Sequence, residues 1–514
     1  MEKKKTKSSK ASKKSNSTKT KKVLKTETVK EVKTEEVKVP KVESKKADHS
    51  TFKILGIVIL VVALLTWFIK GGSWDYTSEV ATFAENETTT TTGIHELFLS
   101  LYYAVNYYLI QIVFLAILGV FYGVISKTNG YKEMVKKSAT LFKNRETIFV
   151  LISSLVIALL ASITTQPIVV ITFIPLLISI AKELKMSKVS TMLMTFGALA
   201  IGLMGLTIGT YGAYYASSQL GTELTNGLIY RIITLIIGYF ALNIFIILFN
   251  KKNKNLEVVD EVFETTTEDK KAKAWPFFVI FGLLLVLVVL GYISWSGVLS
   301  VDVFDNFHEW LTTKIVVGKD EVPIFGKILG AIGAFGTWDA FVINYIMIII
   351  LVFTKFLNHI KLDTLLDNAL EGLKKMAKPI ALVVMAYSVF VLCYWSGMTN
   401  TIVNAFNNGS NFNPYMVALG NTITDFLHVD VEYTGFAFGA FYAAKYANYL
   451  PQLLAIFACA SGLVALVAPT SIYMLIGLSL TNLSYKDYCK SIWKFLIALL
   501  IVVALILTVI TYLV

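Results

Sequence analysis

Charged residues are scarce in this 514-residue sequence. Only 16% of its residues are charged, whereas a soluble globular domain carries roughly a quarter. Hydrophobic residues make up 55% of the chain, and the mean hydropathy is +0.64. This composition excludes an ordinary cytosolic enzyme.

Cysteines and catalytic signatures are scarce as well. The three cysteines, Cys393, Cys459 and Cys489, have no CxxC spacing, and each lies in or beside an apolar stretch. They indicate small core side chains rather than a disulfide framework or a zinc site. The sequence contains no HExxH, GxSxG or Walker-type pattern, which argues against a hydrolase, a metal enzyme or an ATP-driven pump. We therefore expect no enzyme activity and no cofactor, with Na⁺ or H⁺ as a coupling ion at most.

Most of the positive charge is confined to residues 1–50. The formal net charge is +12, and this segment holds 17 lysines against 7 acidic residues. It has no aromatic residue, so it cannot bury enough apolar surface to offset the entropy of ordering. We expect a disordered cytoplasmic tail, either simply solvated or in contact with anionic lipid or ribosomal RNA. The rest of the chain is nearly neutral, which argues against nucleic-acid binding.

Long apolar stretches recur from residue 53 onward, and a helix needs ~20 apolar residues to cross a bilayer. Two stretches, 147–184 and 414–447, are interrupted by polar residues, and at least one arm of each is short for a full span, which predicts re-entrant helical hairpins. The predicted spans are 53–69, 100–125, 189–216, 227–249, 275–297, 339–357, 379–396, 452–480 and 491–513.

Lysine and arginine are distributed unevenly between the two sides of this layout. When the tail and five Lys-rich connecting segments are placed inside, 40 basic residues are cytoplasmic and 4 lie outside. Such an excess is the positive-inside pattern of membrane proteins. It predicts a multi-pass protein of a bacterial plasma membrane, with the N-terminus in the cytoplasm and the C-terminus outside.

The predicted elements fall into two halves that run in opposite directions. Within residues 51–250, span 100–125 is followed by a hairpin, the long span 189–216 and the span 227–249. Within residues 339–514, span 379–396 is followed by a hairpin, the long span 452–480 and the span 491–513, with every direction reversed. Residues 251–338 connect the halves and contribute one spanning helix. This inverted-topology repeat is typical of many secondary transporters. The predicted fold class is an all-α polytopic membrane protein with two re-entrant helical hairpins and two discontinuous helices.

Each half has a polar hairpin tip and, further along, a break inside a long span. The tips are residues 162–167 and 420–425, and the breaks are residues 205–212 and 468–471. Irregular backbone at membrane depth is tolerated only where it is buried or lines a cavity. We therefore expect the tips and breaks to meet near the middle of the membrane. The candidate site residues are Ser162, Thr164, Thr165, Thr207, Gly209, Thr210, Asn421, Thr422, Thr424, Asp425, Thr470 and Ser471.

Interrupted helices supply the chemistry that such a site needs. Half-helix N-termini present unpaired N–H groups and about half a positive charge, so they can hold a carboxylate without Arg or Lys. Half-helix C-termini with Thr and Asn oxygens suit Na⁺, and Asp425 could carry a proton or complete the charge of a bound ion. In the alternative interpretation, the Thr and Ser side chains bond to their own helices and the glycines allow close packing.

Three motifs carry a family resemblance. Residues 67–72 (WFIKGG), residues 119–131 (GVFYGVISKTNGY) and the Gly-Thr-Tyr-Gly break at 209–212 resemble the anaerobic C4-dicarboxylate carrier-like family of the ion transporter superfamily. The resemblance implies a scaffold with a mobile transport region, an elevator-type motion and a homodimer. It also implies that Ser-Asn-Thr-type motifs at the tips and breaks bind Na⁺ and carboxylate. This sequence has no complete triplet of that type at the matching positions, so coupling ion and substrate stay open.

The sequence therefore predicts a secondary active transporter in a lipid bilayer. Its expected substrate is a small anionic or zwitterionic metabolite, either a dicarboxylate or an amino acid, moved with Na⁺ or H⁺ or by exchange. The alternatives are an ion channel and a membrane-embedded enzyme without a recognisable catalytic motif. If Thr210 and Thr470 line the site, Thr→Val at either position is expected to raise the KM of transport or to remove Na⁺ dependence.

Overall fold

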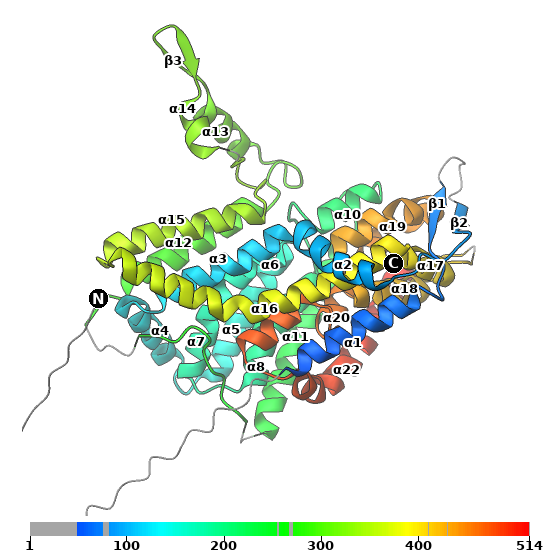
Figure 1. The fold of residues 1–514 in the computed structure, drawn as a ribbon, viewed down its shortest axis with the longest axis horizontal. Helices are drawn as coiled ribbons and strands as arrows, with labels where there is room; N and C mark the ends of the chain where they lie inside the picture. The colour runs from blue at the N-terminus through cyan, green and yellow to red at the C-terminus, as the bar shows by residue number, and fades with distance from the viewer. Residues whose placement is uncertain are drawn as a thin grey trace, which may run out of the picture. The chain divides into compact units, whose positions relative to one another are not determined.

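A computed structural model describes residues 49–512, apart from 76–81, 254–255, 267–270, 331, 410 and 429. The prediction of a disordered tail therefore falls almost entirely outside the described residues. The described chain is built from helices (Figure 1), with two short antiparallel strand pairs. It is an all-α polytopic membrane protein.

The first half begins with α1 and ends with α11. Its elements are α1 (Ser50–Leu65), β1 (Gly72–Asp75), β2 (Thr82–Glu85), α2 (Ile94–Tyr107), α3 (Leu109–Ile125), α4 (Asn129–Phe142), α5 (Glu146–Thr164), α6 (Pro167–Val170), η1 (Ile171–Phe173), α7 (Ile174–Glu183), α8 (Lys188–Met192), the π-helical turn η2 (Leu193–Gly197), α9 (Ala198–Met204), α10 (Ala213–Gln219) and α11 (Leu228–Lys252).

A connecting region and the second half follow. Their elements are α12 (Trp275–Tyr292), α13 (Val303–Thr312), β3 (Ile315–Val317), β4 (Asp320–Val322), α14 (Ile324–Leu329), α15 (Ala340–Leu357), α16 (Leu362–Ser396), α17 (Met398–Phe406), α18 (Pro414–Leu427), α19 (Val431–Lys445), η3 (Ala447–Tyr449), α20 (Leu450–Ala465), α21 (Ile472–Leu480) and α22 (Tyr485–Tyr512). In Figure 1, α13, α14 and β3 project beyond the ends of α12 and α15.

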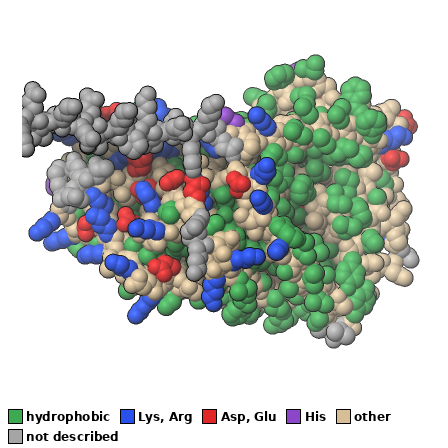
Figure 2. Space-filling model, turned by 90° about the horizontal axis from the view of Figure 1, so that it is seen from below, with side chains coloured by type: hydrophobic (Ala, Val, Ile, Leu, Met, Phe, Trp, Pro, Cys, Tyr) green, Lys and Arg blue, Asp and Glu red, His purple; other side chains and the backbone are tan. Residues whose placement is uncertain are grey.

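Among the described residues, seven helices are long and apolar enough to cross a bilayer, and α2 with α3 makes an eighth if this pair, bent by 69°, is one span. Charged side chains gather over one part of the surface in Figure 2, while hydrophobic side chains predominate over another, with a few charged side chains at its far edge. A bilayer favours such a separation, because charges are costly in its hydrocarbon core.

The same order of elements occurs in both halves. A hairpin (α5 with α6–α7, then α18 with α19) precedes a broken helix (α8–α9 with α10, then α20 with α21), and a long helix (α11, then α22) ends each half. A short helix, α4 or α17, stands before each hairpin. The first tip and both breaks lie where the sequence predicts them, because Pro167, Gly205, Gly212 and Pro469 end or interrupt helices there.

The predicted second tip is wrong. Residues 420–425 lie inside α18, and the turn comes later, between Leu427 and Val431. The polar side chains there are accommodated in the helix because they bond back to its own carbonyls: Asn421 to Val417 at 2.9 Å and Thr422 to Ala418 at 2.7 Å. Polarity alone therefore does not mark a turn in this hairpin.

The helix α16 begins well before the predicted span 379–396. It is 35 residues long and contains Pro379, and its N-terminal part packs against α3 (Figure 1). Glycines make this close approach possible, since a Cβ on Gly123 would lie 2.7 Å from the Cα of Gly372. Small residues of this kind allow helices to pack tightly in membranes.

Candidate functional site

The first hairpin tip and the first break are hydrogen-bonded to each other. The Thr207 backbone N–H donates to the Ser162 carbonyl at 2.9 Å, and the Ser162 hydroxyl donates to the Thr207 hydroxyl at 3.2 Å. Thr165 links the same two segments: its hydroxyl donates to the Tyr211 carbonyl at 2.5 Å and accepts from the Tyr211 N–H at 3.2 Å. These bonds satisfy the backbone groups that the broken helix leaves unpaired.

Glycine is required where the tip meets the break. A Cβ on Gly209 would collide with the carbonyl group and side chain of the Thr164–Thr165 pair. Gly212 has φ +53° and forms the N-cap of α10, a conformation that favours glycine. The Gly-Thr-Tyr-Gly sequence is therefore needed for close backbone approach.

The second hairpin and the second break are also joined. The Thr470 hydroxyl donates to the Phe426 carbonyl at 2.5 Å. Asp425, fully inside the protein, accepts hydrogen bonds from the Thr434 hydroxyl at 3.0 Å and the Ser461 hydroxyl at 2.7 Å. One carboxylate thus ties together α18, α19 and α20.

The two broken helices cross tightly between these tips. A Cβ on Gly462 of α20 would lie 2.5 Å from the Met204 backbone nitrogen and 2.6 Å from the Ala200 carbonyl oxygen, both on α9. Gly202 approaches α5 in the same way, with the Ala158 carbonyl oxygen 2.5 Å from its added Cβ. The crossing therefore fixes the breaks of the two halves relative to each other.

One cavity lies where the two tips, the first break and the start of α21 come together. Its walls include the first tip, the second tip, the first break and the start of α21. The lining residues are Thr165, Pro167, Leu203, Leu206, Gly212, Asp430, Val431, Ser461 and Tyr473. About 290 Å³ is empty, and only about 30 Å³ of it is open to a water-sized molecule, so the cavity has to widen to admit a metabolite.

Several helices begin at this cavity. α19 starts at Val431, with the Asp430 carboxylate accepting from the Glu432 N–H at 2.9 Å. α21 starts next to Tyr473 and is capped by Ser471, and the helical segment that begins with α6 starts at Pro167. Helix N-termini carry partial positive charge, whereas among the described lining residues only Asp430 is charged. The cavity therefore offers backbone N–H groups rather than Lys or Arg side chains.

Apart from Thr210, the predicted site residues divide into three groups. Thr165 lines the cavity, while Ser162, Thr164, Thr207 and Gly209 hold the first tip and break behind it. Thr470 and Ser471 precede the lining residue Tyr473, and Asp425 bonds to the lining residue Ser461. Asn421, Thr422 and Thr424 bond along α18, as in the alternative interpretation.

Thr210 is not among the residues that line the cavity. Its hydroxyl donates to the Gly336 carbonyl in the segment that precedes α15. The adjacent backbone is bound to the end of α12, through the Ser294 N–H to the Ile208 carbonyl at 3.0 Å and an isolated bridge between Gly209 and Ile293. Thr210 therefore anchors the break to the connecting region.

Sequence reasoning missed Asp430, Ser461, Tyr473 and Arg231. Asp430 had a usable signal, because Asp followed by Glu432 before an apolar run is typical of a helix start. Ser461 and Tyr473 stand in apolar helices and gave no comparable signal. Arg231 was left at a span end, although one of only two arginines in a membrane protein is itself notable.

Arg231 is fully buried and holds the first break. From α11 its guanidinium donates to the Leu206 carbonyl at 2.9 Å, to the Thr207 carbonyl at 3.4 Å and to the Leu224 carbonyl. The C-terminal end of α9 has partial negative charge, which would repel an anion in the cavity. Arg231 offsets that charge directly behind the cavity wall.

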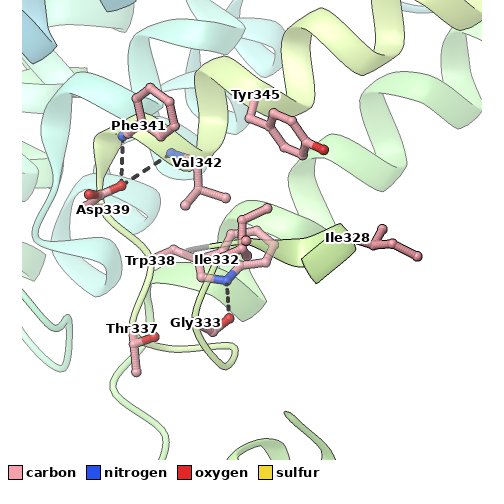
Figure 3. A pocket seen from close by; sticks show the side chains of 10 residues that line it. Ile328, Ile332, Gly333, Thr337, Trp338, Asp339, Phe341, Val342 and Tyr345 are labelled. Atoms are coloured by element: carbon pink, nitrogen blue, oxygen red, sulfur yellow. Dashed lines mark hydrogen bonds between the residues drawn. The ribbon is translucent and has the colours of Figure 1, made fainter. Parts of the chain in front are cut away.

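A larger pocket lies elsewhere, against the start of α15 (Figure 3). It offers about 320 Å³ to a water-sized molecule, but its lining is largely apolar. Its acidic residue, Asp339, is engaged in capping α15 by accepting from the Phe341 and Val342 N–H groups at 2.9 and 3.3 Å. None of the predicted site residues lines this pocket. Among the described residues, no three His, Cys, Asp or Glu side chains form a group that could hold a metal ion.

Comparison with known proteins identifies the family. The family of the DcuC C4-dicarboxylate anaerobic carrier matches residues 49–512. Two solved structures are similar to the chain: the YdaH transporter of Alcanivorax borkumensis (12% identity, TM-score 0.43, 90% of this chain and 99% of that one) and MtrF of Neisseria gonorrhoeae, described as illuminating a class of antimetabolite efflux pumps (11%, 0.33, 89% and 94%). No curated protein matches the sequence. The chain belongs to the C4-dicarboxylate anaerobic carrier family and is a membrane transporter, not an enzyme.

Proposed function

We propose that this protein is a secondary active transporter that binds a C4-dicarboxylate in the cavity between its two hairpin tips. The observation that carries the proposal is the convergence of both tips, the first break and the start of α21 on one cavity. α19 and α21 are 15 and 9 residues long and begin there, so their N–H groups can bind carboxylate oxygens. A substrate with a carboxylate at each end can engage the N-termini of both hairpin regions.

The transport cycle that we propose is of the elevator type. Each tip is bonded to its own break, and the tight crossing of α9 and α20 joins the two halves of the site, so the hairpins and broken helices can move together as a body. The helices α3 and α16, which are packed through glycines, are the natural stationary partner. We further propose a homodimer in a bacterial plasma membrane, with the N-terminus inside and the C-terminus outside. The coupling is to Na⁺ or H⁺ or occurs by exchange.

Uptake of labelled succinate, fumarate and malate into proteoliposomes tests the proposal. We expect saturable uptake that responds to an imposed Na⁺ gradient, to a pH gradient or to dicarboxylate on the opposite side. Flux that dissipates an ion gradient without saturating would indicate a channel instead. Uptake of none of these acids, by protein that is folded and oriented, would refute the substrate assignment.

A dicarboxylic amino acid is the second candidate substrate. The observation that favours it is Asp430, an acidic side chain that is partly exposed in the cavity and could bind an ammonium group. Competition distinguishes the two: labelled succinate uptake is measured with excess unlabelled aspartate or succinate. Stronger inhibition by aspartate would favour the amino acid.

A further inference from the structure

The tip of the second hairpin carries an acid and a histidine that face each other. The Asp430 side chain lines the cavity and is 37% exposed, whereas His428 is 7% exposed. One Asp430 carboxylate oxygen caps α19, and the other lies 3.6 Å from His428 Nε2. The Asp430 carboxylate in the cavity is therefore close enough to interact electrostatically with the buried His428 imidazole.

His428 is surrounded by aromatic rings and lies between Asp430, which lines the cavity, and Tyr108, at the bend between α2 and α3. Its ring centroid is 4.0 Å from that of Phe390 on α16 and 5.4 Å from that of Tyr433 on α19. Tyr108, at the bend, places its hydroxyl 3.3 Å from His428 Nε2, and its ring stacks on Tyr387 of α16.

The titratable groups around His428 come from every element packed against it. They are Tyr108 from the α2–α3 bend, Tyr387 from α16, Asp425 from its own helix α18, and Asp430, Glu432 and Tyr433 from the start of α19. In the described part of the chain, no Lys or Arg forms an ion pair with His428 or Asp430. Aromatic rings supply no counter-charge, so the charge of this pair depends on the protonation of the imidazole.

The imidazole Nε2 faces two alternative partners. When Nε2 is unprotonated, it can accept from the Tyr108 hydroxyl, and the pair with ionised Asp430 has a net charge of −1. When a proton from solvent adds to Nε2, the new N–H can donate to Asp430, the Tyr108 hydrogen bond is released, and the pair is neutral. Histidine is suited to this change because an imidazole nitrogen can either accept or donate a hydrogen bond.

We propose that the His428–Asp430 pair takes up one proton when a dicarboxylate binds, and so couples transport to H⁺. An anion at the start of α19 lies beside Asp430, and like charges in proximity disfavour a pair of net charge −1. Substrate binding and protonation of His428 therefore favour each other, and by linkage each strengthens the other equally. The proton enters from the side to which the cavity is open and leaves on the other side with the substrate. This inference rests on the proposed function of the same cavity.

Proteoliposomes that contain a trapped pH dye test the coupling. With the membrane potential clamped, inward succinate flux by the wild type is expected to acidify the lumen. Because one proton binds with each substrate, the KM for succinate is expected to rise as the pH is raised, by up to about tenfold per pH unit. His428→Gln keeps a polar side chain but has no titration, so uptake should continue without acidification and with a smaller pH dependence. His95→Gln, at an exposed position on α2, is the matched control and should behave as wild type.

Asp430→Asn provides a second variant that keeps the helix cap, since Asn is as good an N-cap as Asp. Loss of acidification with residual uptake in either variant supports the proposal. Because protonation of succinate itself is the same in every sample, the difference between variants reports on the protein. Unchanged acidification per succinate in both variants, or wild-type uptake with no proton movement, overturns the coupling but leaves the proposed function intact. Failure of the wild type to take up any dicarboxylate overturns both.

Discussion

Arg231 provides the sharpest test of how the cavity tolerates an anion. The perturbation is Arg231→Met, which keeps the length and apolar stem of the side chain but removes the guanidinium. The structure shows this group donating to carbonyls at 206, 207 and 224. After the substitution, these buried oxygens lose a charged donor, and the negative end of α9 is no longer offset behind the cavity.

The magnitude follows from those contacts. A buried carbonyl that loses its donor costs about 1–3 kcal/mol, and removal of the guanidinium also relieves the cost of burying a charge. A net loss of about 2–4 kcal/mol is therefore reasonable. If about 1.4–2.8 kcal/mol of this loss destabilises the substrate-bound state relative to the free protein, the KM for a dicarboxylate rises about 10- to 100-fold.

The assay is initial-rate succinate uptake at equal amounts of reconstituted protein. Arg145→Met is the matched control, because Arg145 is the other arginine in the sequence and is exposed before α5. We expect wild-type kinetics for the control and an intermediate KM for Arg231→Lys, which keeps the charge but loses the planar fork. A wild-type KM in folded Arg231→Met protein would refute the electrostatic role assigned to the guanidinium.

Three further predictions follow from the same contacts. Gly462→Val forces a side chain into the α9 backbone near Met204, so the Tm in detergent should fall with a loss of about 1–3 kcal/mol. Gly282→Ala, where nothing lies within 4 Å, should leave the Tm unchanged or raise it slightly, because alanine favours a helix more than glycine does. Thr165→Val removes both hydrogen bonds to Tyr211 and should raise the KM of uptake about tenfold. Thr210→Val should lower thermal stability but leave the KM within about twofold of the wild-type value, a change of under half a kcal/mol. Equal KM values for the two variants would contradict this assignment. Asp425→Asn keeps one acceptor oxygen but puts an amide N–H donor in place of the other, so one of the two hydroxyl hydrogen bonds is lost and uptake at equal expression should fall about tenfold.

The first tip and the two breaks were predictable because their residues affect the backbone itself. Pro167 cannot continue a helix with full hydrogen bonding, and Gly209 and Gly212 permit approaches and dihedral angles that other residues resist. Such signals are local, so a sequence reveals them. The order of elements in the two halves follows from the same local signals and from the spacing of the apolar stretches.

The second tip was not predictable from polarity, because a Thr or Asn within an apolar helix can return its hydrogen bond to the preceding turn. Asn421 does so, and it looks the same in sequence as a residue at a tip. Ser461 and Arg231 were missed for a different reason. Their roles depend on partners that are distant in the sequence, Asp425 for Ser461 and the Leu206 carbonyl for Arg231. Only the folded chain brings those partners within hydrogen-bonding distance.

The anchoring of the first break to Ile293, Ser294 and Gly336 restricts what can move during transport. If the first break moves with the substrate, there are two possibilities. Its hydrogen bonds to these residues break at every turnover, or the segment between α12 and α15 moves together with the break. The second course costs less, because the backbone groups keep their partners throughout. The elements α13, β3, β4 and α14 would then move with the transport region. An antibody or a bulky label bound to them would therefore stop transport without contacting the cavity.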